Sequence, residues 1–508
     1  MSEAVLAGGR GLTLEVVERV ARERARVRLS PEARALMEES RQVVEQALAE
    51  GRAVYGVSTG FGRLSDTLIQ PDERRQLQVN LLRSHATGVG EPLPEPVARA
   101  VMLLRAHTLA GGRSGVRPVL AERLLDFLNA DVVPRIPAQG SVGASGDLAP
   151  LAHLGLVVIG EGEAWGDGGW LPAAGVLEAH GIEPLTLEAK EGLALVNGTQ
   201  VMTAIGILAL LGAERLVETA EVAGALSLEA MRGTRTAFRE EIHDARGHEG
   251  QRVSAARLRA LLGDASDIAT SHEGCGKVQD AYSLRCMPQV HGAVRDALAY
   301  VRRILEIEIN AATDNPLVFP RGDGTGDILS GGNFHGAPVA AALDFLAIAL
   351  ADLASISERR VEGLVDPETS GLAPFLAPRA GLQSGFMMYQ VTAAALVSEC
   401  KGLAHPASVD TIPTSANKED HVSMGVWAAR KAAQVLANAE FVVAIELLSA
   451  AQGIDLLRPL RTSERLERGH GLIRSRVPRL DEDRPGASDI EAIAGLVRGG
   501  SFAHVWSH

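Results

Sequence analysis

Cysteine and aromatic residues are both scarce in this chain of 508 residues. The three cysteines, Cys275, Cys286 and Cys400, lie far apart and have no histidine partners at zinc-site spacing. This excludes a disulfide framework as the basis of the fold, and no cluster of histidine, cysteine and carboxylate residues has the spacing of metal ligands. We therefore expect reduced thiols, a cytoplasmic location and no metal site.

The chain also lacks excess basic charge and a clear membrane-spanning segment. Its formal net charge of −13 disfavours nucleic acid as a partner. The first residues have no apolar core of the signal-peptide type, so we expect no secretion signal. Residues 193–212 are uncharged and about as long as a membrane span, but they include Asn197 and Gln200 and lack flanking basic residues. We expect a buried helix after a polar turn, and no membrane partner.

Helical patterns dominate what is present. Ser30–Pro31 predicts an N-cap and the first helical position, and Gly51 predicts the end of that helix. Glycine and proline are frequent up to residue 184, which favours an irregular head with scattered helices. Long helices are predicted over residues 199–232, 336–364, 384–403 and 421–452. The expected fold is mainly α, an elongated helical bundle with an irregular N-terminal head, divided into residues 1–198 and 199–508.

The tripeptide Ala144–Ser145–Gly146 lies in the segment QGSVGASGDLAPLAH, residues 139–153. Small residues allow the backbone to bend back on itself. If the Gly146 nitrogen attacks the Ala144 carbonyl and two waters leave, a five-membered ring forms and Ser145 becomes an exocyclic methylidene, an electrophile. A flexible turn is the plain alternative. A hydrolase nucleophile elbow, Gly-x-Ser-x-Gly, fails because Asp147 occupies the second glycine position.

This segment resembles the one from which aromatic amino-acid ammonia-lyases form their methylidene-imidazolone group (MIO). Roughly eight motifs in the family's order extend the resemblance over about residues 50–460. It implies an ammonia-lyase/fumarase-like helical fold, MIO formed from Ala144–Ser145–Gly146, and no metal or diffusible cofactor. It also implies a homotetramer whose active sites draw on three subunits, so that Tyr55, the tripeptide, Arg285 and Glu419 converge only after assembly.

The same resemblance implies roles for residues around the tripeptide. Tyr55, in YGVSTGFG, corresponds to the catalytic base, and Ser58 stands where relatives usually have Asn. Asn197, in LVNGTQ, corresponds to the residue that polarises the MIO oxygen; the alternative is an N-cap for the next helix. Phe334, in SGGNFHG, would pack on the MIO ring, and Asn315 belongs to a further family segment, NAATDNPL.

Substrate binding is implied for a second group of residues. In QDAYSLRCMPQ, Arg285 would grip the substrate carboxylate with two parallel hydrogen bonds, while Gln279 and Tyr282 line the site. His85, in NLLRSHATGVGEP, would contact the substrate ring, and Met387 matches a pocket methionine of histidine-specific relatives.

Glu419, in SANKEDHVSMG, matches a glutamate of histidine-specific members, and a carboxylate suits an imidazole partner. Lys418, where relatives usually have Gln, is expected to pair with this carboxylate and change its pKa. The alternative for this segment is the favourable start of a helix through its two acids.

The resemblance therefore implies that the chain binds a small amino acid and eliminates ammonia from L-histidine to give trans-urocanate. The chain has Gly336–Ala337 where histidine-specific relatives usually have Ala-Glu. Two alternatives stay open. One is a tyrosine ammonia-lyase or an aromatic aminomutase that uses the same electrophile, and the other is a helical scaffold without turnover.

Overall fold

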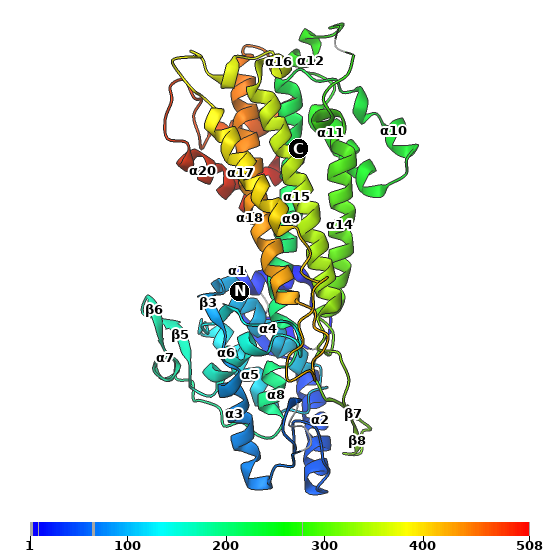
Figure 1. Cartoon of the computed structure of the whole chain (residues 1–508), viewed down its shortest axis with the longest axis vertical. Coiled ribbons are helices and arrows are strands. Elements are labelled where there is room, and N and C mark those ends of the chain that lie inside the picture. Colours follow the sequence, from blue (N-terminus) through cyan, green and yellow to red (C-terminus); the bar gives the residue numbers. More distant parts are fainter. Residues whose placement is uncertain (1–3, 9, 63–66, 277, 507–508) are drawn as a thin grey trace. The chain divides into compact units, whose positions relative to one another are not determined.

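The computed structural model in Figure 1 describes residues 4–8, 10–62, 67–276 and 278–506. As predicted, the chain is mainly α-helical. Its described strands form four sheets of two strands each. The parallel pair is β1 (Val5–Ala7) with β2 (Val27–Leu29); the antiparallel pairs are β3 (Val89–Pro92) with β4 (Pro137–Gln139), β5 (Glu163–Gly166) with β6 (Gly169–Pro172), and β7 (Leu317–Pro320) with β8 (Gly326–Leu329).

The chain divides into two compact units, each built from several segments. The first unit runs to Leu208 and takes in Arg302–Asp344 and Pro406–Arg430. The second comprises Ala209–Val301, Phe345–His405 and the chain from Lys431 onward. The boundary expected between residues 198 and 199 stays a prediction.

Short and medium helices make up most of the first unit. They are α1 (Leu14–Arg22), α2 (Pro31–Ala49), η2 (Pro71–Glu73), α3 (Arg74–His85), α4 (Glu95–Ala110), α5 (Pro118–Asn129), α6 (Leu148–Val158), α7 (Ala173–Ala179) and α8 (Glu191–Val196). Helix α4 lies against α1 and α5 and is buried from Val97 to Ala110. It is therefore the central helix of this unit.

Helix α2 begins and ends where the sequence predicts. The Ser30 hydroxyl accepts a hydrogen bond from the Ala33 amide at 3.0 Å, and Pro31 is the first helical residue. After the helix ends at Ala49, Gly51 takes a φ of +70°, a left-handed conformation that glycine adopts without strain.

Five long helices follow: α9 (Gln200–Ala230), α14 (Met287–Glu308), α15 (Ala337–Val365), α17 (Met387–Leu403) and α18 (Gly425–Leu456). Four of them confirm the predicted long helices to within a few residues, and α14 was not predicted. The remaining helical segments are η3 (Thr236–Phe238), α10 (Glu240–Asp244), α11 (Glu249–Leu262), α12 (Asp267–Ser271), α13 (Tyr282–Arg285), α16 (Pro367–Ser370), η4 (Pro374–Leu376), α19 (Glu464–Arg474), α20 (Ala487–Arg498) and η5 (Ser501–Trp506).

A buried ion pair ties three of these helices together inside the second unit. Glu446 of α18 accepts hydrogen bonds from Arg360 of α15 at 2.5 and 2.8 Å. The same carboxylate also accepts from Ser227 of α9 and Ser357 of α15. All four side chains are buried, so the buried charges of Arg360 and Glu446 are paired with each other and with polar groups.

Helices α9, α15 and α18 are long and apolar enough to cross a membrane by length and composition alone. Their most apolar windows are 89%, 67% and 78% buried inside the protein. The expected buried helix after a polar turn is found, because α8 ends at Val196 and α9 begins at Gln200. The apolar faces of these helices are thus largely covered by the chain itself.

Candidate functional site

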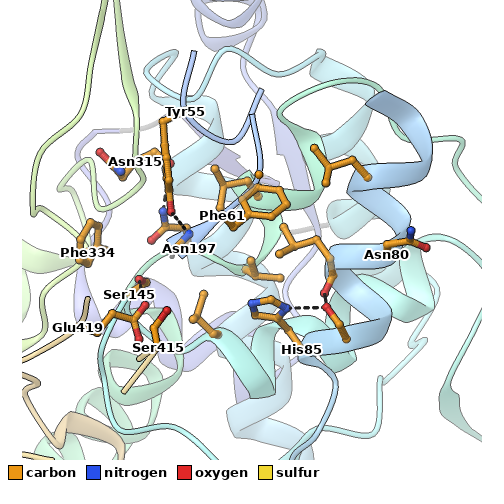
Figure 2. A pocket seen from close by; sticks show the side chains of 18 of the residues that line it. Tyr55, Phe61, Asn80, His85, Ser145, Asn197, Asn315, Phe334, Ser415 and Glu419 are labelled. Carbon is orange, nitrogen blue, oxygen red and sulfur yellow. Dashed lines mark hydrogen bonds between the residues drawn. The ribbon is translucent and has the colours of Figure 1, made fainter. Parts of the chain in front are cut away.

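A cavity of about 510 Å³ lies in the first unit, and Figure 2 shows the side chains around it. Its apolar wall includes Phe61, Leu81 and Leu193. Many of the residues singled out in the sequence line it together: Tyr55, His85, Ser145, Asn197, Asn315, Phe334 and Glu419. A largely apolar cavity with a few convergent polar groups is the usual form of a small-molecule site.

The tripeptide forms a turn that is held firmly on two sides. On one side Gly146 pairs with Gly198, and the Asp147 amide donates to the Gly198 carbonyl at 2.7 Å. Gly146 has a φ of +78°, and a Cβ there would lie 2.1 Å from the Gly198 oxygen. On the other side the Met424 amide donates to the Val142 carbonyl at 2.8 Å. The segment is therefore a fixed turn and not a flexible one.

Asp147 anchors this turn to a helix far along the chain. Its buried carboxylate accepts hydrogen bonds from the amides of Val201 and Met202, at 2.8 and 2.9 Å, in the first turn of α9. Burial raises the pKa of Asp147 to about 7, while these hydrogen bonds act in the opposite direction. Asp147 thus satisfies the first amides of α9, a role that the sequence did not indicate.

Asn197 consequently does not cap α9, and the N-cap alternative is wrong. Its amide nitrogen donates to the Asn315 carbonyl at 3.1 Å. Its Oδ1 atom is buried and meets no donor in the part of the chain that the structure describes. A buried acceptor without a partner is costly and marks a place where a further group can bind.

The Tyr55 hydroxyl is held at the cavity by hydrogen bonds within its own loop. It accepts a hydrogen bond from the Gly62 amide at 3.1 Å, and the ring makes an edge contact with Phe61. Ser58 accepts from the Val54 amide at 2.9 Å and also donates to the backbone, which holds the loop in shape.

Glu419 lies directly against the tripeptide. Its Oε1 accepts from the Ser145 hydroxyl at 3.1 Å, and its Oε2 accepts from Thr414 at 2.7 Å. Two expectations for this segment are wrong. Helix α18 starts only at Gly425, so the acids do not open a helix, and Lys418 is exposed and makes no ion pair with any described residue.

His85 ends α3 and faces the same cavity, as Figure 2 shows. Its Nδ1 atom lies 3.0 Å from the Ser84 hydroxyl. Burial lowers the pKa of His85, although the charge of Glu419 opposes this. The imidazole is therefore neutral near pH 7 and presents one donor and one acceptor.

Asn315 and Phe334 complete this side of the cavity. Asn315 is buried, and its Oδ1 accepts from the Gly331 amide at 2.7 Å. It thus also fixes the loop that leads to Phe334.

Four predicted residues do not line this cavity: Gln279, Tyr282, Arg285 and Met387, all of the second unit. Tyr282 is 71% exposed, and the Arg285 guanidinium lies over its ring at 4.5 Å. The expectation that the key residues converge only after assembly is wrong for Tyr55, Ser145 and Glu419, which a single chain brings together. No group of three or more potential metal ligands occurs in the described ranges.

Comparisons with known proteins agree on one family. A sequence model described as aromatic amino acid lyase matches residues 12–475. Proteins named histidine ammonia-lyase from Koribacter versatilis (strain Ellin345) and Anaeromyxobacter sp. (strain K) are each 56% identical, over 97% and 98% of this chain and 98% and 99% of their own lengths.

Solved structures give the same picture. Histidine ammonia-lyase from Trypanosoma cruzi has a TM-score of 0.91 and 46% identity, covering 99% of this chain and 95% of that one. Tyrosine aminomutase from Streptomyces globisporus has a TM-score of 0.93 and 41% identity, covering 99% and 98%.

Proposed function

The chain belongs to the aromatic amino acid lyase family, and from that membership we propose that it eliminates ammonia from L-histidine to give trans-urocanate. The observation that carries this substrate is the carboxylate of Glu419, which reaches the tripeptide at 3.1 Å from Ser145. An imidazole N–H can donate to a carboxylate, whereas an apolar phenyl ring cannot compensate for its desolvation. Relatives named histidine ammonia-lyase over nearly the full length support the same choice.

The residues of the turn fit a methylidene-imidazolone formed from Ala144, Ser145 and Gly146. The Gly146 backbone is already held in a left-handed bend against Gly198 with no space for a side chain. Ser145 faces the cavity, so the ring would have open space beside it. When formed, this group supplies an electrophilic carbon that ordinary side chains lack.

Elimination breaks one Cβ–H bond and the Cα–N bond of the substrate, and the proton leaves with the amine as ammonium. Tyr55 is the proposed proton acceptor, because its oxygen is fixed at the cavity by the Gly62 amide. His85 and Glu419 hold the substrate ring, and the neutral imidazole of His85 can match either ring nitrogen. The apolar wall around Phe61 excludes water from the reacting atoms.

We further propose a cytoplasmic homotetramer in which second-unit residues of other subunits complete the site. Arg285 would bind the substrate carboxylate, with Gln279, Tyr282 and Met387 beside it. The high exposure of Tyr282 supports this, since a large aromatic side chain left in solvent is available to a partner.

The competing substrate is tyrosine, and similarity to a tyrosine aminomutase favours testing it. Purified protein is incubated with histidine, tyrosine and phenylalanine, and the absorbance of each conjugated acid is followed. Growth with histidine is expected. Growth with tyrosine alone, or a β-amino acid as product, would overturn the substrate assignment.

The mechanism is tested at Ser145. Intact mass of the purified chain should lie two waters below the mass of the translated sequence. Ser145→Ala should remove that difference and lower the rate by orders of magnitude. Ser475→Ala, at an exposed position just after α19, serves as the control and should keep the mass loss. A Ser145→Ala protein with parental activity would contradict the proposal.

A further inference from the structure

Arg105, in the central helix α4, carries a charge that no described carboxylate pairs with. Its side chain is fully buried. One nitrogen, Nη1, donates to the Asn197 carbonyl at 2.6 Å and to Gln200 Oε1 at 3.0 Å. The Nε and Nη2 atoms meet no acceptor in the described ranges. Burying an unpaired cation lowers the stability of the fold, which indicates that the group has a function.

The same helix contains a guanidinium that is buried in the ordinary way. Arg99 is equally buried, but it pairs with Asp131 at 2.7 Å and donates to the carbonyls of Val20 and Leu128. All three of its nitrogens therefore have partners. Arg99 and Arg105 are therefore equally buried, and they differ in their hydrogen-bond partners.

Arg105 faces the backbone segment on which the tripeptide rests. Asn197, whose carbonyl it binds, precedes Gly198, the residue that pairs with Gly146. A Cβ on Gly198 would lie 2.8 Å from Arg105 Nη1, so the guanidinium lies directly against this backbone segment. Gln200 is itself fixed, because its amide nitrogen donates to Thr108 and Thr313.

Other buried charges nearby do not neutralise Arg105 by direct contact. Lys190 and Asp314 form their own ion pair at 2.8 Å. The Asp147 carboxylate accepts hydrogen bonds from the first amides of α9. Both carboxylates raise the pKa of Arg105 through space, yet burial outweighs them and lowers it to about 10, so the group stays charged at neutral pH.

We propose that Arg105 is a positioning residue that orients Asn197 toward the tripeptide and places an unpaired positive charge beneath the cavity floor. The charge favours the build-up of negative charge above it, during ring closure between Gly146 and Ala144 and during loss of the substrate's β-proton. This inference rests on the proposed function. It assigns to Arg105 no contact with substrate.

The charge is tested without removing Arg105. Gln200→Glu sets a carboxylate where Oε1 lies 3.0 Å from the guanidinium, which gives Arg105 a partner and cancels its field. We expect kcat to fall about tenfold or more with a much smaller change in KM, and a slower loss of two waters by intact mass. Gln434→Glu, at an exposed position of α18, is the matched control and should change neither.

The positioning role is tested with Arg105→Lys and Arg105→Met, compared with Arg99→Met. Lysine keeps the charge and can still reach the Asn197 carbonyl, so Arg105→Lys should recover most of the activity that Arg105→Met loses. Arg99→Met should lower the melting temperature but keep kcat within about twofold and the full mass loss. If Arg105→Met does not fold, the kcat values of Gln200→Glu and Arg105→Lys test the proposal instead.

Parental kcat and complete dehydration in Gln200→Glu would overturn the charge effect. An equal loss of kcat in Arg99→Met would reduce Arg105 to a structural role and overturn the inference. The mass measurement needs no substrate, so it separates the two proposals. If the parent chain loses two waters but leaves histidine intact, only the assignment of histidine as substrate is refuted. A parent chain at its full translated mass refutes both proposals.

Discussion

At the scale of single residues, Glu419 divides its two carboxylate oxygens between Ser145 and Thr414. Glu419→Gln keeps the size but loses the charge. Because a hydrogen bond to a charged group contributes about 1.5–3 kcal/mol, we expect kcat/KM for histidine to fall roughly 10- to 100-fold. Asp420→Asn, at the exposed neighbouring position, is the control and should behave as the parent does in the same absorbance assay. An equal loss in both variants would speak against a role in substrate binding.

His107 gives a prediction for stability against pH. Burial lowers its pKa from 6.5 to about 4, and among the described residues only Nε2 has a partner, Asn310. The unfolded chain takes up a proton near pH 6.5 and the folded chain only near pH 4. The free energy of unfolding should therefore fall as the pH drops between these values, by a total on the order of 3 kcal/mol.

His107→Gln should flatten this part of the curve, since glutamine takes up no proton. Urea unfolding at several pH values between 7 and 4 measures it. His180→Gln, at an exposed position, should leave the slope of the parent unchanged. An identical slope in His107→Gln would show that other groups carry the dependence.

Sequence could find the residues whose motifs are local, such as Tyr55 and Ser145, because their neighbours in the chain define them. It could not find the role of Asp147, whose partners Val201 and Met202 come from another helix. It missed Arg105 for the same reason, since its acceptors lie beyond residue 196. The expected pairing of Lys418 failed because that side chain points into solvent.

At the scale of elements, the contact between α11 and α14 depends on glycine. A Cβ on Gly292 of α14 would lie 2.4 Å from the backbone nitrogen and Cα of Gln251 in α11. Gly292→Ala must push the two helices apart, so we expect a loss of about 1–3 kcal/mol despite the better helix propensity of alanine. Thermal or urea unfolding measures this.

The matched substitution is Gly402→Ala in the last turn of α17. This glycine is exposed, and a Cβ there meets nothing within 4 Å. The same change should therefore stabilise the chain, by up to about 1 kcal/mol. If both variants shifted stability in the same direction, close helix contact would not be the cause.

The start of a helix could be predicted from the sequence where the capping residue and the apolar periodicity agree, as at Ser30–Pro31. Helix α14 was missed although Val290, Val294 and Leu298 have helical spacing. Pro288 and Gly292 lie early in it and indicate a break. The structure places Pro288 in the first turn, where a missing amide hydrogen does no harm, and uses Gly292 for packing.

At the scale of the whole molecule, the proposed assembly predicts complementation between two inactive proteins. Tyr55→Phe removes the proposed base in the first unit, and Tyr282→Phe changes a residue of the second. If sites combine residues of different subunits, co-expressed or refolded mixtures should contain some intact sites and regain activity. Each variant alone is the control, and ultracentrifugation should show four times the 53.5 kDa of one chain. A mixture without activity would place both residues in the same subunit's site.

Sequence also indicated the mainly helical class of the whole chain, since long apolar periodicities need no knowledge of contacts. It could not show that Ser415 to Asn417 turn through left-handed conformations, which bring Glu419 back to Ser145. That geometry depends on segments far apart in the chain. Local patterns therefore identify the site residues, whereas contacts between distant segments determine their geometry.

The turn around Ser145 rests on Gly198 and Met424, which leave the ribosome well after it. A nascent chain that has not yet reached residue 424 lacks one of the two braces. We therefore expect the proposed alkene to arise only once residue 424 has been made, so that translation products that end earlier stay chemically inert toward cellular amines and thiols.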